Sequence, residues 1–168
     1  MSKQIIFSAL LIMSNCVIIG QNKVLDLQIE NSKVTNDGIS FNLVITNVSD
    51  TPIRTYLPQK RDICNSLLKI NCINVYTGQS RDLVFCGYID DLDCIILDSL
   101  NTVLLTPKES FEQYFYFPNR DLYIKRKRKK KDIYQISVEW RLKDVSFKGL
   151  FENVFRDTVE SNKIEILL

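Results

Sequence analysis

The chain has 168 residues, 45% of them hydrophobic and 25% charged, which is ordinary globular composition with enough length for one hydrophobic core. The absence of His excludes the usual Ser-His-Asp and Cys-His catalysis and every His-ligated metal site. No glycine-rich nucleotide loop and no HExxH motif occurs. We therefore predict a protein that is not an enzyme and that uses no cofactor or metal. A hydrolase acting through two carboxylates is the alternative.

The N-terminus has the order of a secretory signal peptide. Lys3 precedes an apolar stretch at 5–19, and Gly20 leads into polar sequence. We predict a signal peptide at 1–20 and an exported mature domain at 21–168, which would be periplasmic, on the cell surface or secreted. The apolar stretch is short for a membrane span. No apolar stretch in the predicted mature chain is longer. A lipid anchor at Cys16 is disfavoured, because the flanking residues fit a lipoprotein signal poorly.

Hydrophobic and polar residues alternate in the first part of the predicted mature domain. Residues 38–47, "GISFNLVITN", form a half-buried strand by this pattern, and its apolar face carries Ile39, Phe41, Leu43 and Ile45. Further strands are predicted at 23–30 and 53–57. The turn "NVSDTP", which joins the strand 38–47 to the strand 53–57, contains a glycosylation sequon at Asn47. For Asn47 we favour the simpler role of a turn cap.

Four cysteines follow in the spacing C-x7-C-x13-C-x7-C: Cys64, Cys72, Cys86 and Cys94. Zinc sites need closely spaced pairs, so a metal is disfavoured, whereas disulfides are the default in an oxidising compartment. A hairpin of strands 67–76 and 82–89 centred on Gln79 would place Cys72 opposite Cys86. We therefore predict a Cys72–Cys86 disulfide and, by the same symmetry, Cys64–Cys94. Reduced core cysteines are the alternative.

Short strands are predicted next at 94–97, 102–105 and 111–117, and seven adjacent basic residues follow. This basic run consists of Lys125, Arg126, Lys127, Arg128, Lys129, Lys130 and Lys131. The full chain has a net charge of +2; without Lys3 it is +1, and without the run the remainder carries −6. The run is either a solvated loop, with the residues on its two sides paired as strands, or a patch for an anionic partner.

Acidic polysaccharide, lipid headgroups or an acidic protein surface would suit such a patch. Nucleic acid is disfavoured, because export removes the chain from the cytosol and no aromatic residue within the run could stack on bases.

The last part of the chain contains the longest alternation. In "DIYQISVEWRL" at 132–142 one face carries Tyr134, Ile136, Val138, Trp140 and Leu142, and we predict that Trp140 lies in the core. Near 145–155 the apolar residues recur with helical spacing, which indicates one short helix or an irregular crossover: Phe147, Leu150, Phe151, Val154 and Phe155. A final strand is predicted at 161–167.

Many short strands with frequent turns predict an all-β fold, a single antiparallel β-sandwich. The segments "FNLVITNVSDTPI", "LTPKESFEQYF" and "YQISVEW" resemble exported immunoglobulin-like domains and are similar to BsuPI-type proteinase inhibitor domains. The resemblance implies an immunoglobulin-like fold, and no inhibitory residue carries over. We expect an exported, non-catalytic binding or interaction module, with a proteinase-inhibitor-like domain as the alternative.

Overall fold

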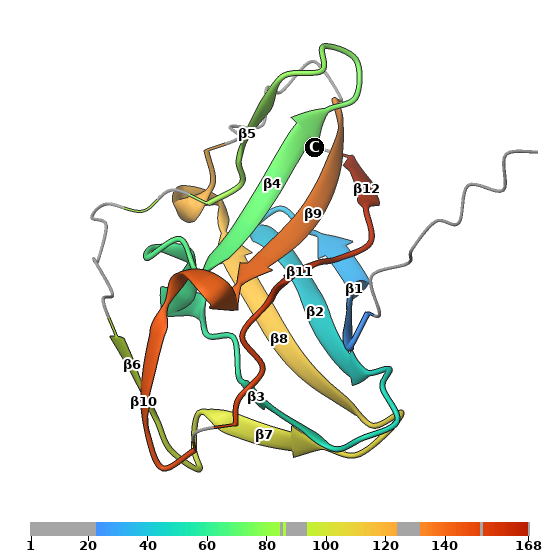
Figure 1. The fold of residues 1–168 in the computed structure, drawn as a ribbon. Coiled ribbons are helices and arrows are strands. Elements are labelled where there is room, and N and C mark those ends of the chain that lie inside the picture. Colours follow the sequence, from blue (N-terminus) through green and yellow to red (C-terminus); the bar gives the residue numbers. More distant parts are fainter. Residues whose placement is uncertain (1–22, 85, 87–93, 124–131, 152, 168) are drawn as a thin grey trace, which may run out of the picture.

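The chain folds as an all-β protein, as predicted from the alternation of its strands. The computed structural model describes residues 23–84, 86, 94–123, 132–151 and 153–167. Two main sheets lie face to face in a sandwich, accompanied by two small two-stranded sheets (Figure 1). The predicted signal peptide and the basic run fall outside the described residues. Among the described residues, no helix is long and apolar enough to cross a membrane.

The first sheet has the strand order β1-β2-β8 and is antiparallel throughout. Its strands are β1 (Leu25–Val34), β2 (Gly38–Asn47) and β8 (Ser110–Pro118). Strand β2 lies in the centre, and its predicted apolar face is almost completely buried, with exposed fractions of 0–1% for Ile39, Phe41, Leu43 and Ile45. The alternation that predicted this strand therefore also predicted which face packs into the core.

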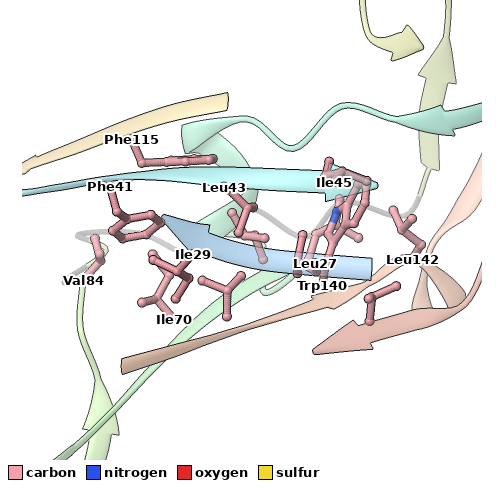
Figure 2. Packing of buried hydrophobic residues seen from close by; sticks show 14 of the residues in the cluster. Leu27, Ile29, Phe41, Leu43, Ile45, Ile70, Val84, Phe115, Trp140 and Leu142 are labelled. Atoms are coloured by element: carbon pink, nitrogen blue, oxygen red, sulfur yellow. The ribbon is translucent and has the colours of Figure 1, made fainter. Parts of the chain in front are cut away.

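The second sheet is built around β9 (Ile133–Arg141). On one side β9 pairs with β4 (Leu68–Asn74), which pairs with the short β5 (Ser80–Asp82). On its other side β9 pairs with β11 (Thr158–Glu160) and β12 (Ile164–Leu167). Trp140 of β9 is completely buried, as predicted, and Figure 2 shows its ring between the strands of the two sheets.

Two small sheets lie beside the sandwich. Strand β3 (Ile53–Tyr56) pairs antiparallel with β7 (Thr102–Leu105), and β6 (Cys94–Leu97) pairs parallel with β10 (Ser146–Gly149). Three single 3-10 turns complete the described elements: η1 (Lys60–Ile63), η2 (Asn119–Asp121) and η3 (Leu142–Asp144).

The short helix considered for 145–155 does not form, and the irregular crossover describes most of this segment better. Strand β10 occupies its first part. Gly149, at the end of β10, has a φ of +117°, which no α-helix contains, and a Cβ atom at this position would lie 2.4 Å from the carbonyl oxygen of Leu97. Leu150, a member of the helical stripe, is 75% exposed, whereas Phe147 and Val154 are buried. The 3.6-residue spacing here therefore reflects an extended segment that touches the core intermittently.

Candidate binding site

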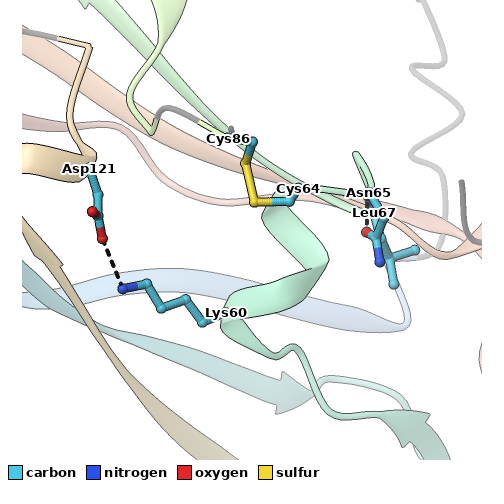
Figure 3. The surroundings of a disulfide bond; sticks show 6 residues. All are labelled: Lys60, Cys64, Asn65, Leu67, Cys86 and Asp121. Carbon is cyan, nitrogen blue, oxygen red and sulfur yellow. Dashed lines mark hydrogen bonds and ion pairs between the residues drawn. A yellow bond between two sulfur atoms is a disulfide. The ribbon is translucent and has the colours of Figure 1, made fainter. Parts of the chain in front are cut away.

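One disulfide joins Cys64, directly after η1, to Cys86, which follows β5 (Figure 3). Their Cα atoms lie 5.4 Å apart. The predicted pairs Cys72–Cys86 and Cys64–Cys94 are both wrong, because Cys72 and Cys94 are free. Cys72 lies on the buried face of β4, and this burial raises the pKa of its thiol to about 12, so it is not a reactive thiolate.

The pairing was wrong because the hairpin has a different register. Cys72 is opposite Arg81 and Ile73 is opposite Ser80, so the turn comes earlier than the predicted centre at Gln79. The Asn74 side chain accepts hydrogen bonds from the backbone N–H groups of Tyr76 and Thr77 at 3.0 and 2.9 Å, and Gly78 has a φ of +68°. Asn and Gly in these roles were the available signal for the turn.

A buried carboxylate fixes the turn that carries Cys64. Asp62 of η1 is 0% exposed; it accepts hydrogen bonds from the backbone N–H of Gln59 at 2.7 Å and from the Tyr56 hydroxyl at 3.2 Å. Burial raises the pKa of Asp62. Burial, together with the nearby Asp62, also raises the pKa of Tyr56 to about 12. These contacts attach η1, and with it one half of the disulfide, to strand β3.

A cleft of about 250 Å³ adjoins the disulfide. Its apolar wall includes the buried side chains of Leu68, Ile70 and Val84. Ile63 adds a further apolar side chain, and the remaining lining combines the disulfide with polar, charged and aromatic groups: Cys64, Ser66, Lys69, Asp82, Cys86, Tyr123 and Arg141. The volume is just below the usual range for small-molecule sites, so the cleft suits one side chain or one small headgroup.

The charges at the cleft nearly balance. Lys69 lies 3.9 Å from Asp82, and Arg141 lies 2.7 Å from Glu139. The hydrogen bond from Arg141 lowers the pKa of Glu139 below its ordinary value. Because each of these cations has an acidic neighbour, the cleft has little net charge of its own. A strong attraction for anions would need additional positive charge nearby.

Tyr123 before the basic run and Ile133 after it are described, whereas Ile124 and the run itself lie outside the described residues. The backbone N–H of Tyr123, a cleft residue, donates to the carbonyl of Leu83 at 3.1 Å. After the run, Ile133 pairs with Leu167 of β12, and its carbonyl accepts from Val75 at 2.9 Å. The predicted pairing of the two flanks is therefore wrong for these residues, because separate neighbours hold them.

The sequon at Asn47 is used as a turn cap. Its side chain is 0% exposed; the amide donates to the carbonyls of Thr51 at 2.8 Å and Leu105 at 3.0 Å, and the amide oxygen accepts from the backbone of Ser49 at 2.9 Å. The structural role predicted for this residue is confirmed, and a glycan on it would be incompatible with the folded turn.

Acidic and metal-ligating residues do not gather in the described part of the chain. Asp82 is the one carboxylate among the described residues that line the cleft, whereas glycoside hydrolysis needs two that face each other. In the part of the chain that the structure describes, no group of three or more His, Cys, Asp or Glu side chains could hold a metal ion. The described cleft therefore offers a surface for binding and no recognisable catalytic pair.

Comparison with known proteins adds no assignment to this geometry. No protein-family model matches the chain, and no curated protein matches it significantly. The resemblance to BsuPI-type domains thus stays a prediction from sequence.

Proposed function

We propose that this protein is an exported, non-catalytic binding module that recognises an anionic partner through the basic run and the adjoining cleft. Acidic polysaccharide and anionic lipid headgroups present the same chemistry of closely spaced negative charges. The cleft would receive one group of the ligand, and the run would supply the excess positive charge that the nearly neutral cleft does not have.

Chain connectivity is the observation that carries this proposal. Tyr123 lines the cleft, and Lys125 follows it by two residues. Since an extended chain advances at most about 3.6 Å per residue, the Cα atoms of these residues are within roughly 7 Å of each other. The start of the run is therefore linked through a short piece of backbone to a residue that lines the cleft.

The disulfide supports export. Disulfides persist in oxidising compartments and are rare in the cytosol, and Cys64–Cys86 agrees with the signal peptide predicted at 1–20. Export is tested by measuring the intact mass of the protein recovered outside the cytoplasm. We expect a chain that begins at Gln21, whereas a chain beginning at a lipidated Cys16 would contradict the predicted cleavage.

Binding is tested with vesicles that contain anionic lipid and with a heparin resin, each at low and high salt. Replacing Lys129, Lys130 and Lys131 with Ser should weaken vesicle binding by about two orders of magnitude, because each lysine near an anionic surface contributes about 1 kcal/mol. Binding by the unmodified protein should fall steeply with salt. Comparing heparin with vesicles distinguishes a polysaccharide from a lipid partner.

A matched control removes the same charge elsewhere. Replacing Lys33, Lys148 and Lys163 with Ser also removes three positive charges from exposed positions, but none of these residues lines the cleft. This variant should bind nearly as well as the unmodified protein. Equal losses in the two variants would show that only net charge matters, and no binding by the unmodified protein at low salt would overturn the proposal.

A further inference from the structure

Strand β8 forms one edge of the first sheet. It pairs with β2 through nine consecutive residue pairs, from Gly38 opposite Pro118 to Thr46 opposite Ser110, without a register shift. No other described strand pairs with β8. Glu112, Tyr114 and Tyr116 project their side chains from the outer face of the sheet and are exposed. The edge is thus long and regular.

Hydrogen bonding across the sheet determines which backbone groups of β8 face outward. On the far edge of β1, the Asn162 side chain accepts from the N–H of Ile29 at 2.6 Å and donates to its carbonyl at 3.3 Å. Because the pattern alternates in antiparallel sheets, Leu43, opposite Ile29, bonds to β8 through its partner Gln113. The next residue, Tyr114, and also Glu112 and Tyr116, therefore direct their N–H and C=O groups away from β2.

Other sheet edges in the described part of the chain are short or covered. The edge of β1 is closed by Asn162 and by a parallel bridge between Leu27 and Ser161, and β5 has only three residues. Proteins usually protect long edges with Lys, Pro or a bulge. Strand β8 has no Lys, its one Pro is the final residue, and its ladder has no bulge. Among these three protections the described structure therefore shows none along the interior of β8, and Glu112 is its one charged residue.

We propose that β8 pairs antiparallel with β8 of a second copy of this chain, so that the three strands of each copy form one continuous sheet. With the two-fold axis at Tyr114, each outward N–H of Glu112, Tyr114 and Tyr116 meets an outward carbonyl of the other copy. Adding a strand to an open edge is an established mode of protein association.

The side chains on the outer face support self-pairing in this register. Tyr114, which is 62% exposed, would lie opposite Tyr114 of the second copy, and aromatic cross-strand pairs are favourable. Glu112 would lie opposite the neutral Tyr116; within the chain, Glu112 accepts from the Asn42 amide and the Tyr116 hydroxyl donates to the Asp37 carbonyl at 3.4 Å. Glu112 is the one charged residue in β8, and this register keeps the two Glu112 side chains apart. The register therefore matches the outward backbone groups of the two copies and avoids repulsion between like charges.

The test is the mass of the purified protein in solution, measured by sedimentation over a range of concentrations. We expect a monomer–dimer equilibrium. Tyr114→Lys would place two like charges opposite each other and should raise the Kd of the dimer by about tenfold or more. Tyr114→Pro should also weaken the dimer, because it removes an outward N–H while sparing the bonds to β2.

Tyr76→Lys is the matched control, since Tyr76 is 68% exposed in the turn after β4 and lies away from the β8 edge; it should leave the Kd unchanged. Circular dichroism verifies that each variant is folded. In a concentrated sample of the unmodified protein, the amide hydrogens of Glu112, Tyr114 and Tyr116 should exchange more slowly than in a dilute one. A protein that stays monomeric up to about 1 mM, or a dimer that survives both Tyr114 variants, would overturn the proposal.

Discussion

Trp140 is the largest fully buried side chain in the described core, and it is buried with one polar group unpaired. Its indole Nε1 has no hydrogen-bond partner among the described residues. An unpaired buried donor costs about 1–3 kcal/mol, whereas the ring is completely buried between the two sheets near the end of β9. The residue therefore combines a large favourable packing contribution with a smaller unfavourable one.

Replacing Trp140 should separate these contributions. Trp140→Ala should lower the free energy of unfolding by about 3–5 kcal/mol, because it leaves a cavity between the sheets. Trp140→Phe should cost much less, since it keeps a ring and removes the unpaired N–H. Chemical denaturation measures both, and Tyr76→Ala at an exposed site is the control. A loss in Trp140→Phe as large as that in Trp140→Ala would contradict this expectation.

Asp62 should make stability depend on pH. Burial raises its pKa above the ordinary value of 3.8, so the folded state binds a proton more tightly than the unfolded chain does. Stability contributed by this proton is complete below 3.8 and is lost as the pH rises through the higher pKa of the folded state. Melting temperatures of the unmodified protein and Asp62→Asn, measured from acidic to neutral pH, should show this dependence in the former only. Parallel curves would contradict it.

At the level of elements, alternation predicted strands well where one face is continuously buried. Strands β2 and β9 were located with their inward residues because every second side chain contacts the core. The symmetric spacing of the cysteines predicts the wrong register for the β4–β5 hairpin. Asn74 and Gly78 determine its turn. The contact between Cys64 and Cys86 joins residues 22 apart in sequence, and it depends on where Asp62 and Tyr56 hold the η1 turn.

The cleft was not predicted for the same reason. Its lining comes from η1, β4, the segment after β5, Tyr123 and Arg141, which are separated in sequence and are brought together only by the packing of the second sheet. The basic run was visible in the sequence, but the place of Tyr123, two residues before it, at the cleft depends on the backbone bond between Tyr123 and Leu83.

The observed connectivity predicts unequal effects of the cysteines. Non-reducing peptide mapping should link Cys64 to Cys86, and replacing this pair with Ser should lower stability by about 3 kcal/mol, the loop-entropy value for a loop of similar length. Cys72→Ala removes one buried sulfur and should cost about 1 kcal/mol. A peptide linking Cys72 to any other cysteine would contradict the structure.

Gly149 should be essential for the parallel pairing of β10 with β6. Gly149→Ala would place a Cβ 2.4 Å from the Leu97 carbonyl oxygen at a φ of +117°, and we expect a loss of about 1–3 kcal/mol. Gly78→Ala is the control: its φ is also positive, at +68°, but no atom lies within 4 Å of the added Cβ. Thermal unfolding of the two variants should show a larger loss for Gly149→Ala.

On the scale of the whole molecule, Asn162 connects the first described strand to the segment between β11 and β12. Asn162→Ala would leave the N–H and C=O of Ile29 without their partner, which should cost about 1–2 kcal/mol and accelerate hydrogen exchange at the Ile29 amide. Lys163→Ala, at the exposed next residue, should change neither. Unchanged exchange in Asn162→Ala would contradict a protective role of the Asn162 side chain.

The contact between Ile29 and Asn162 spans 133 residues. It therefore cannot form until most of the chain has been synthesised. At ribosomal rates of about 5–20 residues per second, β1 is made roughly 7–27 s before the residue that closes its edge. During that interval Leu27 and Ile29 cannot reach their final surroundings, and contacts between such distant residues form slowly. On the proposed export route this delay is useful. A chain that cannot complete its β-sandwich before its C-terminal segment is made stays unfolded, and an unfolded chain can pass through the translocation channel.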